Sequence, residues 1–375
     1  MKQLLAALLA CIAFCAAAQG TAPTPPPIAA RAYYVFDTLS GQPLAAAAEN
    51  EPFEPASLTK LMTAYVAFDA LRAGRIEVGK SVPVSEAAVR APGARMFLAA
   101  GTTVTVSDLL RGLIVQSAND AAIALAEAVS GSEAAFVTAM NAHAARLGLA
   151  KTTFVNPTGQ PAAGHLASAR DMAVLAAALA RDYPEHYPIY AQKEFTYSRM
   201  TQGNRNRLLW TDPTVDGLKT GFTESAGYCL VASAKRGERR LVSVVLGAQT
   251  EALRISETQK LLNFGFLAYD TRRLYKRGEA VGAAPVYKGI QGSVRLGFDR
   301  DVWLTLPRER FTGLTAVLET RQPFVAPLAA GEKAGIMKLM RDRAPLAEFP
   351  VVALEDVPIA GFLSRGWDSL RLLFK

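Results

Sequence analysis

Pro55-Ala56-Ser57-Leu58-Thr59-Lys60-Leu61-Met62-Thr63-Ala64-Tyr65-Val66-Ala67-Phe68 is the most informative stretch of this sequence. Its apolar residues recur at helical spacing and Pro55 keeps the preceding residue extended, so we predict a buried helix that begins near Ser57. Residues three apart share a helix face, which places the Lys60 amine beside the Ser57 hydroxyl. A neutral amine can take the proton of a serine and make it a nucleophile. Alone, Ser-x-x-Lys is a weak signal, because a solvated pair on a surface helix gives the same pattern.

A second motif, Ser117-Ala118-Asn119, lies between apolar segments that we expect to be helical. Buried serine and asparagine side chains need hydrogen-bond partners, and a site between packed helices would supply them. Taken alone, the motif favours the simpler interpretation of a helix N-cap, because serine often caps helices.

A third motif, Lys219-Thr220-Gly221, precedes Phe222 in a strand-like run. Thr220 favours a strand, Gly221 permits close approach of the backbone to a ligand, and Lys219 brings a second cation. If both lysines share one pocket, we expect their repulsion to lower the pKa of Lys60. Alone, Lys-Thr-Gly would be interpreted as a turn.

Strands, then helices, then strands follow one another along residues 19–272. Residues 32–36 and 43–45 are typical of a hairpin, residues 85–180 are rich in Ala and Leu and mostly helical, and apolar strands return afterwards. This order predicts an α/β domain in which one mixed sheet is backed by a helical cluster. Short alternating runs then predict a small all-β domain over residues 273–356, for which we expect a role as spacer or platform.

Both ends of the chain carry segments outside these domains. Residues 1–18 combine Lys2, an apolar stretch and Ala16-Ala17-Ala18, which predicts a secretory signal peptide. Once it is removed, only Cys229 remains of 3 cysteines, which excludes an internal disulfide. Residues 357–375 predict an amphipathic helix, too short and too charged to span a bilayer, that lies on an anionic membrane surface. A helix docked on the β-domain is the alternative.

Composition excludes several classes of function. Half of the 375 residues are hydrophobic and 20% are charged, as in an ordinary globular protein, and the net charge is +8. The basic residues are spread out, which argues against nucleic acid as a partner and favours an anionic cell envelope or membrane surface. We find no His-Glu-x-x-His or other ligand cluster, so we expect no metal and no cofactor, and no Gly-x-Ser-x-Gly of a Ser-His-Asp hydrolase.

Together and in this order, Ser-x-x-Lys, Ser-x-Asn and Lys-Thr-Gly are the signature set of serine β-lactamases and penicillin-binding proteins. More specifically, the chain resembles the low-molecular-mass penicillin-binding proteins that are D-alanyl-D-alanine carboxypeptidases. The β-rich second domain and a C-terminal amphipathic helix are also features of that family, so the resemblance covers nearly the whole mature chain. The matching stretches are residues 55–65, 113–122, 168–173, 204–210, 215–223 and 227–234.

This resemblance implies an acyl-enzyme mechanism on the D-Ala-D-Ala end of peptidoglycan stem peptides, and acylation by β-lactam antibiotics. Ser57 would attack the penultimate D-Ala carbonyl, with Lys60 as general base. Ser117 would relay a proton to the leaving D-Ala, and Asn119 would hold the peptide backbone.

The same resemblance implies further substrate contacts. Lys219-Thr220-Gly221 would line the opposite wall, and the backbone N–H groups of Ser57 and Phe222 would form the oxyanion hole; some relatives carry His at the position of Phe222. Arg205 and Arg254 match family positions near the site, and Arg254 would hold the terminal carboxylate through paired N–H bonds. From the sequence alone, a surface ion pair is the alternative for both arginines.

Two related functions stay open as alternatives. A class A-like β-lactamase shares the three motifs but deacylates with a glutamate acting through water, whereas residues 152–157 of this chain hold no acid. A sensor that is acylated by penicillin without turnover would normally be fused to transmembrane helices, and none is predicted here. We therefore expect an exported carboxypeptidase at the periplasmic face of the cytoplasmic membrane, anchored peripherally by its C-terminal helix.

Overall fold

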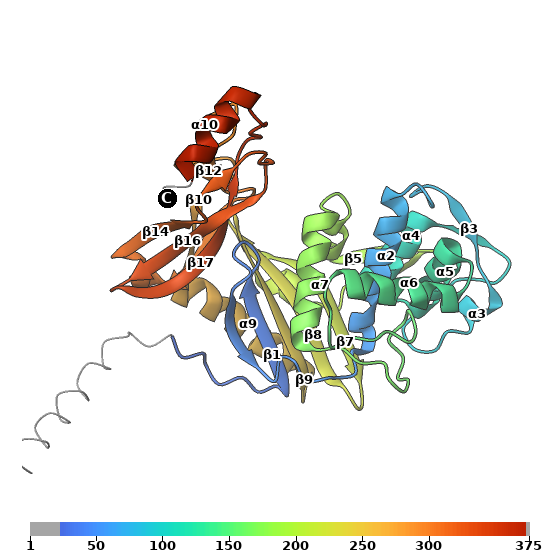
Figure 1. Ribbon diagram of the computed structural model, residues 1–375. Helices are drawn as coiled ribbons and strands as arrows, with labels where there is room; N and C mark the ends of the chain where they lie inside the picture. Colours follow the sequence, from blue (N-terminus) through green and yellow to red (C-terminus); the bar gives the residue numbers. More distant parts are fainter. Residues whose placement is uncertain (1–22, 373–375) are drawn as a thin grey trace, which may run out of the picture.

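A computed structural model describes residues 23–372 of the chain (Figure 1). The predicted signal peptide, residues 1–18, lies outside the described residues. Figure 1 shows a central sheet with a helical cluster at one end and a separate β-rich domain at the other.

The central sheet has five strands in the order β2-β1-β9-β8-β7. The predicted hairpin is formed by β1 (Ala32–Asp37) and β2 (Pro43–Ala47), and the later strands are β7 (Val215–Thr223), β8 (Gly227–Arg236) and β9 (Arg239–Ala248). Every neighbouring pair is antiparallel, so the sheet is not mixed as predicted. Short turns join β1 to β2, β7 to β8 and β8 to β9, and a short turn can join only antiparallel strands. β7 is an edge strand, and that edge belongs to the site described below.

Helices cover both faces of this sheet, which confirms the predicted α/β architecture. Successive strand residues point to opposite faces, and accordingly Val231 and Val244 pack in one core with Leu61, whereas Leu230 packs in a second core with Leu261. The first core contains α2 (Lys60–Arg72) and α7 (Ala169–Asp182), and the second contains α9 (Glu251–Ala268).

The helical cluster follows the predicted pattern with one difference at the start of α2. Ser57 lies in a 3-10 turn, η1 (Ala56–Thr59), and the α-helix begins only at Lys60, without a capping side chain. Ser168 caps the start of α7, because its Oγ accepts a hydrogen bond from the Asp171 N–H at 3.1 Å. The other helices are α3 (Glu86–Val89), α4 (Val106–Arg111), the π-helical turn η2 (Gly112–Gln116), α5 (Asn119–Ser130), α6 (Glu133–Arg146), η3 (Tyr187–Ala191) and α8 (Leu208–Thr211).

Two small hairpins complete the N-terminal domain. One joins β3 (Ser81–Pro83) to β4 (Thr103–Thr105), and the other joins β5 (Glu194–Tyr197) to β6 (Met200–Gly203).

The predicted all-β domain is confirmed. β10 (Tyr269–Tyr275) follows α9 directly and pairs with β13 (Val302–Pro307). A second sheet has the order β14-β16-β17-β12-β11-β15. Its strands are β11 (Ala280–Tyr287), β12 (Ser293–Gly297), β14 (Leu314–Thr320), β15 (Phe324–Val325), β16 (Lys333–Arg341) and β17 (Ala344–Ala353), and a 3-10 turn, η4 (Arg308–Phe311), precedes β14.

Hydrogen bonds join the two domains at their boundary. Thr271 Oγ1 donates to Asp37 Oδ2 at 2.6 Å, and the hydroxyls of Ser40 and Thr305 lie 2.6 Å apart. The β1–β2 hairpin of the first domain is thereby tied to the β10–β13 pair of the second.

The predicted amphipathic segment contains α10 (Phe362–Leu372). Phe362 and Trp367 are exposed, while Asp368 Oδ2 accepts a hydrogen bond from the Lys288 N–H at 2.6 Å, which ties α10 to the end of β11. Between residues 23 and 372 no single helix has the length and apolar composition to cross a membrane; α5 and α6 meet those criteria only as a pair bent by 84°.

Candidate active site

Ser57 and Lys60 lie side by side where η1 passes into α2. Lys60 Nζ donates to Ser57 Oγ at 3.2 Å and to the Thr158 carbonyl at 2.5 Å. The Lys60 side chain is almost completely buried, with a relative exposure of 1%. The one-turn spacing therefore produces the predicted contact between amine and hydroxyl, although the turn that carries Ser57 is 3-10 rather than α.

The environment of Lys60 favours the neutral amine. Burial, and after it the positive charge of Arg205, lower the pKa of Lys60 to about 7, against an opposing effect of Asp120. The prediction that repulsion by Lys219 lowers the pKa of Lys60 needs correction, because burial has the larger effect on this pKa and Arg205 is the main cationic influence. Repulsion between the two lysines does act on Lys219, whose pKa is lowered first by burial and then by Lys60.

The segment 156–160 supports Lys60 and was missed by the sequence reasoning. Asn156 Oδ1 accepts hydrogen bonds from the N–H groups of Thr158, Gly159 and Gln160 and from the Thr158 hydroxyl, at 2.7 to 3.2 Å. Gly159 has φ +86° and packs so tightly on the Ala56 carbonyl that a Cβ would collide with it. This tight turn aims the Thr158 carbonyl at Lys60.

His165 attaches the same loop to the nucleophile turn. Its Nδ1 accepts a hydrogen bond from the Val155 N–H at 3.2 Å, and its Nε2 lies 2.8 Å from Thr59 Oγ1, so Nε2 carries the proton and donates. Burial lowers the pKa of His165 to about 4, which keeps the ring neutral. None of the three histidines forms a hydrogen bond with Ser57. The base beside the Ser57 hydroxyl is therefore Lys60.

Ser117 and Asn119 occupy the turn between η2 and α5. Ser117 is buried and has the left-handed backbone φ 63°, ψ 33°, and the cap residue of α5 is Ala118, without a side-chain bond. The N-cap interpretation of this motif is therefore wrong. Asn119 Nδ2 donates to the Pro92 carbonyl at 2.5 Å, whereas its buried Oδ1 has no hydrogen-bond partner among the described residues. A buried acceptor without a partner is costly, and a ligand N–H would satisfy it.

Asp120, directly after the Ser-x-Asn motif, was also missed. Its relative exposure is 1%, and its carboxylate accepts hydrogen bonds from the N–H groups of Met96 and Leu98 at 3.0 and 3.1 Å. The loop 92–98 is thereby held against the Ser117–Asn119 turn. A carboxylate directly after Ser-x-Asn in an otherwise apolar stretch is the signal that could have identified it.

The edge strand β7 forms the opposite wall and carries Lys219, Thr220, Gly221 and Phe222. Lys219 and Thr220 are buried, and Lys219 Nζ donates to the Thr220 carbonyl at 3.0 Å. A Cβ on Gly221 would lie 3.1 Å from the Pro55 carbonyl and 3.3 Å from Ala56 Cβ. Gly221 is thus needed for the close approach of β7 to the nucleophile turn of the protein itself, and the approach of its backbone to a ligand stays a prediction.

Two arginines, Arg254 and Arg205, were predicted to lie near the wall formed by β7. Arg254, on α9, is 4% exposed, forms an ion pair with Glu251 at 2.7 Å, and keeps its Nε without a partner among the described residues. Its guanidinium lies 5.5 Å from the centre of the Tyr228 ring, which in turn packs on Phe222 at 4.4 Å. Arg205 is exposed and has no ion pair with any described residue, but its charge lowers the pKa values of Lys60 and Lys219. The surface ion-pair interpretation therefore fails for Arg205. In the pair of Arg254 the arginine is buried, whereas Glu251 is 54% exposed.

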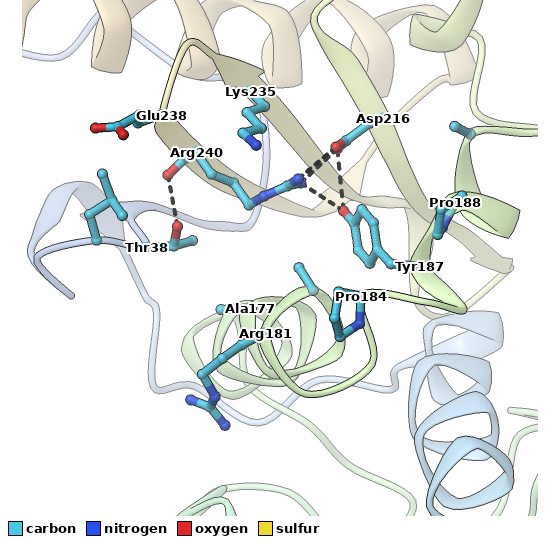
Figure 2. Close-up of a pocket in the computed structure, with 13 residues that line it drawn as sticks. Thr38, Ala177, Arg181, Pro184, Tyr187, Pro188, Asp216, Lys235, Glu238 and Arg240 are labelled. Atoms are coloured by element: carbon cyan, nitrogen blue, oxygen red, sulfur yellow. Dashed lines mark hydrogen bonds and ion pairs between the residues drawn. The ribbon is translucent and has the colours of Figure 1, made fainter. Parts of the chain in front are cut away.

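A separate cavity of about 670 Å³ lies at the beginning of β7 and contains none of the predicted site residues (Figure 2). Figure 2 shows the Arg240 guanidinium reaching across it to Asp216, with which it forms an ion pair at 2.7 Å, and to the Tyr187 hydroxyl. These contacts fix β7 three residues before Lys219. Within residues 23–372 no cluster of three or more His, Cys, Asp or Glu side chains could hold a metal ion.

Comparison with known proteins agrees with this geometry. The sequence model of the D-alanyl-D-alanine carboxypeptidase family matches residues 19–250, and that of the penicillin-binding protein 5 C-terminal domain matches residues 269–358. The chain belongs to the D-alanyl-D-alanine carboxypeptidase family. The predicted activity of a serine-type D-Ala-D-Ala carboxypeptidase is thereby confirmed, and the alternatives of a β-lactamase or a sensor are not favoured.

Individual relatives cover nearly the whole chain. D-alanyl-D-alanine carboxypeptidase DacC of Escherichia coli (strain K12) is 42% identical over 93% of this chain and 89% of its own length. The crystal structures of penicillin binding protein 5 from Haemophilus influenzae include a chain that is 40% identical, with a TM-score of 0.87, over 90% of this chain and 99% of that chain. Both domains of this carboxypeptidase therefore have counterparts in the family.

Proposed function

We propose that this carboxypeptidase removes the terminal D-alanine of peptidoglycan stem peptides through an acyl-enzyme on Ser57. The observation that carries the proposal is the contact of 3.2 Å between Ser57 Oγ and a buried Lys60 amine whose pKa is lowered to about 7. At neutral pH a large share of Lys60 is then unprotonated and able to take the Ser57 proton.

The reaction proceeds in two halves. Ser57 Oγ attacks the penultimate D-Ala carbonyl while Lys60 accepts its proton, and the oxyanion that forms is stabilised by the backbone N–H groups of Ser57 and Phe222. When the tetrahedral intermediate collapses, the C–N bond breaks, and the proton held by Lys60 is relayed through the Ser117 hydroxyl to the amine of the leaving D-Ala, which leaves Lys60 neutral again. Water then hydrolyses the ester on Ser57, again with Lys60 as base, and frees the shortened peptide.

The walls of the site position the peptide. Asn119 Oδ1, buried and without a partner among the described residues, accepts an N–H of the substrate backbone. Lys219 and Thr220 line the other wall, and Gly221 lets this wall close on the nucleophile turn. The unpaired Arg254 Nε, in an otherwise buried guanidinium, suits a terminal carboxylate in place of the ion pair with Glu251.

The assignment of Ser57 is tested by Ser57→Ala. Because a β-lactam mimics the scissile amide, the wild-type chain should be labelled stoichiometrically by fluorescent penicillin and should release D-Ala from a stem-peptide mimic. Ser57→Ala should lose both activities. Stoichiometric labelling that persists in the variant would contradict the proposal.

We also propose how the segments of the chain divide the work. Residues 1–18 direct export, residues 19–272 form the D,D-carboxypeptidase domain, and residues 273–356 form a β-domain that acts as a stalk. Residues 357–375 attach the enzyme peripherally to the periplasmic face of the cytoplasmic membrane. The exposed Phe362 and Trp367 of α10, 84% and 63% accessible, support attachment to an anionic lipid surface. The bond between Lys288 and Asp368 supports the alternative of a docked helix.

Deletion of residues 357–375 separates these two roles of the tail. If the tail is an anchor, the truncated protein should move to the soluble fraction, with D-Ala release from a small peptide intact. If the truncated protein stays with the membrane, or loses its fold, the tail is not a simple anchor.

A further inference from the structure

Phe97 has a backbone conformation that is unfavourable for a bulky side chain. It has φ 64°, in the left-handed region, and its side chain is 54% exposed. For a bulky residue this region is strained, and strain of this kind persists only where the surroundings enforce it. Other such residues, Arg199, Asp342 and Arg343, lie in hairpin turns that require a positive φ, but Phe97 does not. It is the only aromatic residue with a positive φ in the described part of the chain.

The surroundings that enforce this conformation are buried. Asp120 accepts the N–H groups on both sides of Phe97, from Met96 and Leu98, whose side chains are 1% and 5% exposed. Gly112 leaves the space that the Met96 thioether fills. With its two neighbours fixed inward by one carboxylate, Phe97 can only point outward.

This loop belongs to the wall that carries Ser117 and Asn119. The Asn119 N–H donates to the Ala94 carbonyl at 2.7 Å, and Gln202 of β6 braces the loop through the Arg95 carbonyl at 3.1 Å. The Arg95 guanidinium lies 5.5 Å from the centre of the Phe97 ring and steadies it. Three separate contacts thus hold an exposed ring beside the Ser-x-Asn motif.

We propose that Phe97 is a specificity-determining residue, whose ring forms an apolar platform for a long aliphatic side chain on the residue that precedes D-Ala-D-Ala. The inference rests on the proposed function. The two D-alanines carry only methyl groups, and the terminal carboxylate is assigned to Arg254, so neither needs a large apolar surface. The backbone of the peptide is assigned to Asn119 and β7. An aromatic platform therefore suits the next residue upstream, which is the first position at which the substrate can present a long side chain.

The test compares two synthetic substrates, Nα,Nε-diacetyl-lysyl-D-Ala-D-Ala and Nα-acetyl-glycyl-D-Ala-D-Ala. Because Asn tolerates a positive φ, Phe97→Asn should remove the platform without adding strain. We expect the ratio of kcat/KM, lysyl over glycyl substrate, to fall about tenfold, as for a lost apolar contact, while the Tm stays equal or rises. Phe97→Leu should retain most of the ratio. Leu267→Ala, which removes an exposed apolar side chain of α9, serves as the matched control and should leave the ratio unchanged.

An unchanged ratio in Phe97→Asn, or an equal loss on both substrates, would overturn the proposal, and an equal loss together with a lower Tm would assign Phe97 a structural role. Failure of the Ser57 assignment would be seen separately, as penicillin labelling of Ser57→Ala. The substrate ratio requires only that the chain release D-Ala, so the two failures are distinguishable.

Discussion

The two domains of this carboxypeptidase treat polar groups in opposite ways. In the N-terminal domain Lys60, Lys219 and Arg254 are 1%, 3% and 4% exposed. In the described part of the C-terminal domain, residues 269–372, the only buried polar side chain is Thr305, which lies at the boundary with the first domain. Burial of a charge costs free energy unless it is paired, and that cost is retained where the group has a task. The comparison places the chemistry in the first domain.

Ion pairs in the second domain face solvent. Lys338 pairs with Glu319 at 2.7 Å and Arg295 with Glu355 at 3.0 Å, and all four side chains are at least 30% exposed. Exposed pairs of this kind contribute little to stability, because water and salt screen their charges. The ion pairs of the β-domain therefore add little to its stability, which rests on the apolar core around Leu296 and Val351.

The largest expected difference between the domains is in the effect on kcat/KM of replacing a buried arginine of the first domain or an exposed arginine of the second. Arg254→Ala should lower kcat/KM for D-Ala-D-Ala substrates by roughly 10²-fold, because a charge-assisted bond to the terminal carboxylate of about 2–3 kcal/mol is lost. Arg295→Ala, at a partly exposed ion pair of the β-domain, should leave kcat/KM unchanged. An amidated substrate without the carboxylate should be insensitive to Arg254→Ala, and an equal loss on that substrate would argue against the role.

A smaller effect should distinguish the two causes of the lowered Lys60 pKa. Because the charge of Arg205 lowers the pKa of Lys60, Arg205→Gln should raise that pKa and move the rise of acylation rate to higher pH. Burial, the larger cause, remains in the variant, so the midpoint should stay well below that of a free lysine. A pH–rate profile of penicillin acylation measures the shift, and an unmoved midpoint would mean that burial alone sets the pKa.

Much of the fold and the centre of the site could be predicted from side-chain patterns. The periodicity of α2 and the Ser168 cap of α7 are local signals that tertiary packing reinforces. The three motifs could be brought together from the sequence because their order is itself a signature. Their side chains, such as Lys60 and Asn119, are polar residues in apolar segments, and such residues are conspicuous.

What could not be predicted depends on backbone groups. The partners of Lys60 and Asn119 are the carbonyls of Thr158 and Pro92, and every residue has a carbonyl, so no side chain marks them. Long loops, whose conformation is fixed by tertiary contacts, carry both carbonyls. The cause of the lowered pKa of Lys60 was misjudged for the same reason, because the degree of burial depends on the loop that covers the amine.

A neutral, buried Lys60 that activates Ser57 is the basis of the proposed mechanism. The most direct test is the rate at which benzylpenicillin acylates Ser57, measured as a function of pH. Mass spectrometry of the peptide that contains Ser57 monitors the acylation. Below its pKa Lys60 is protonated and cannot act as a base, and above it the amine is free, so the rate should rise with pH through one ionisation near pH 7. The added mass should lie on the peptide that contains Ser57. A rate that rises only near pH 10, as for an ordinary lysine, or an added mass on another peptide, would contradict the account.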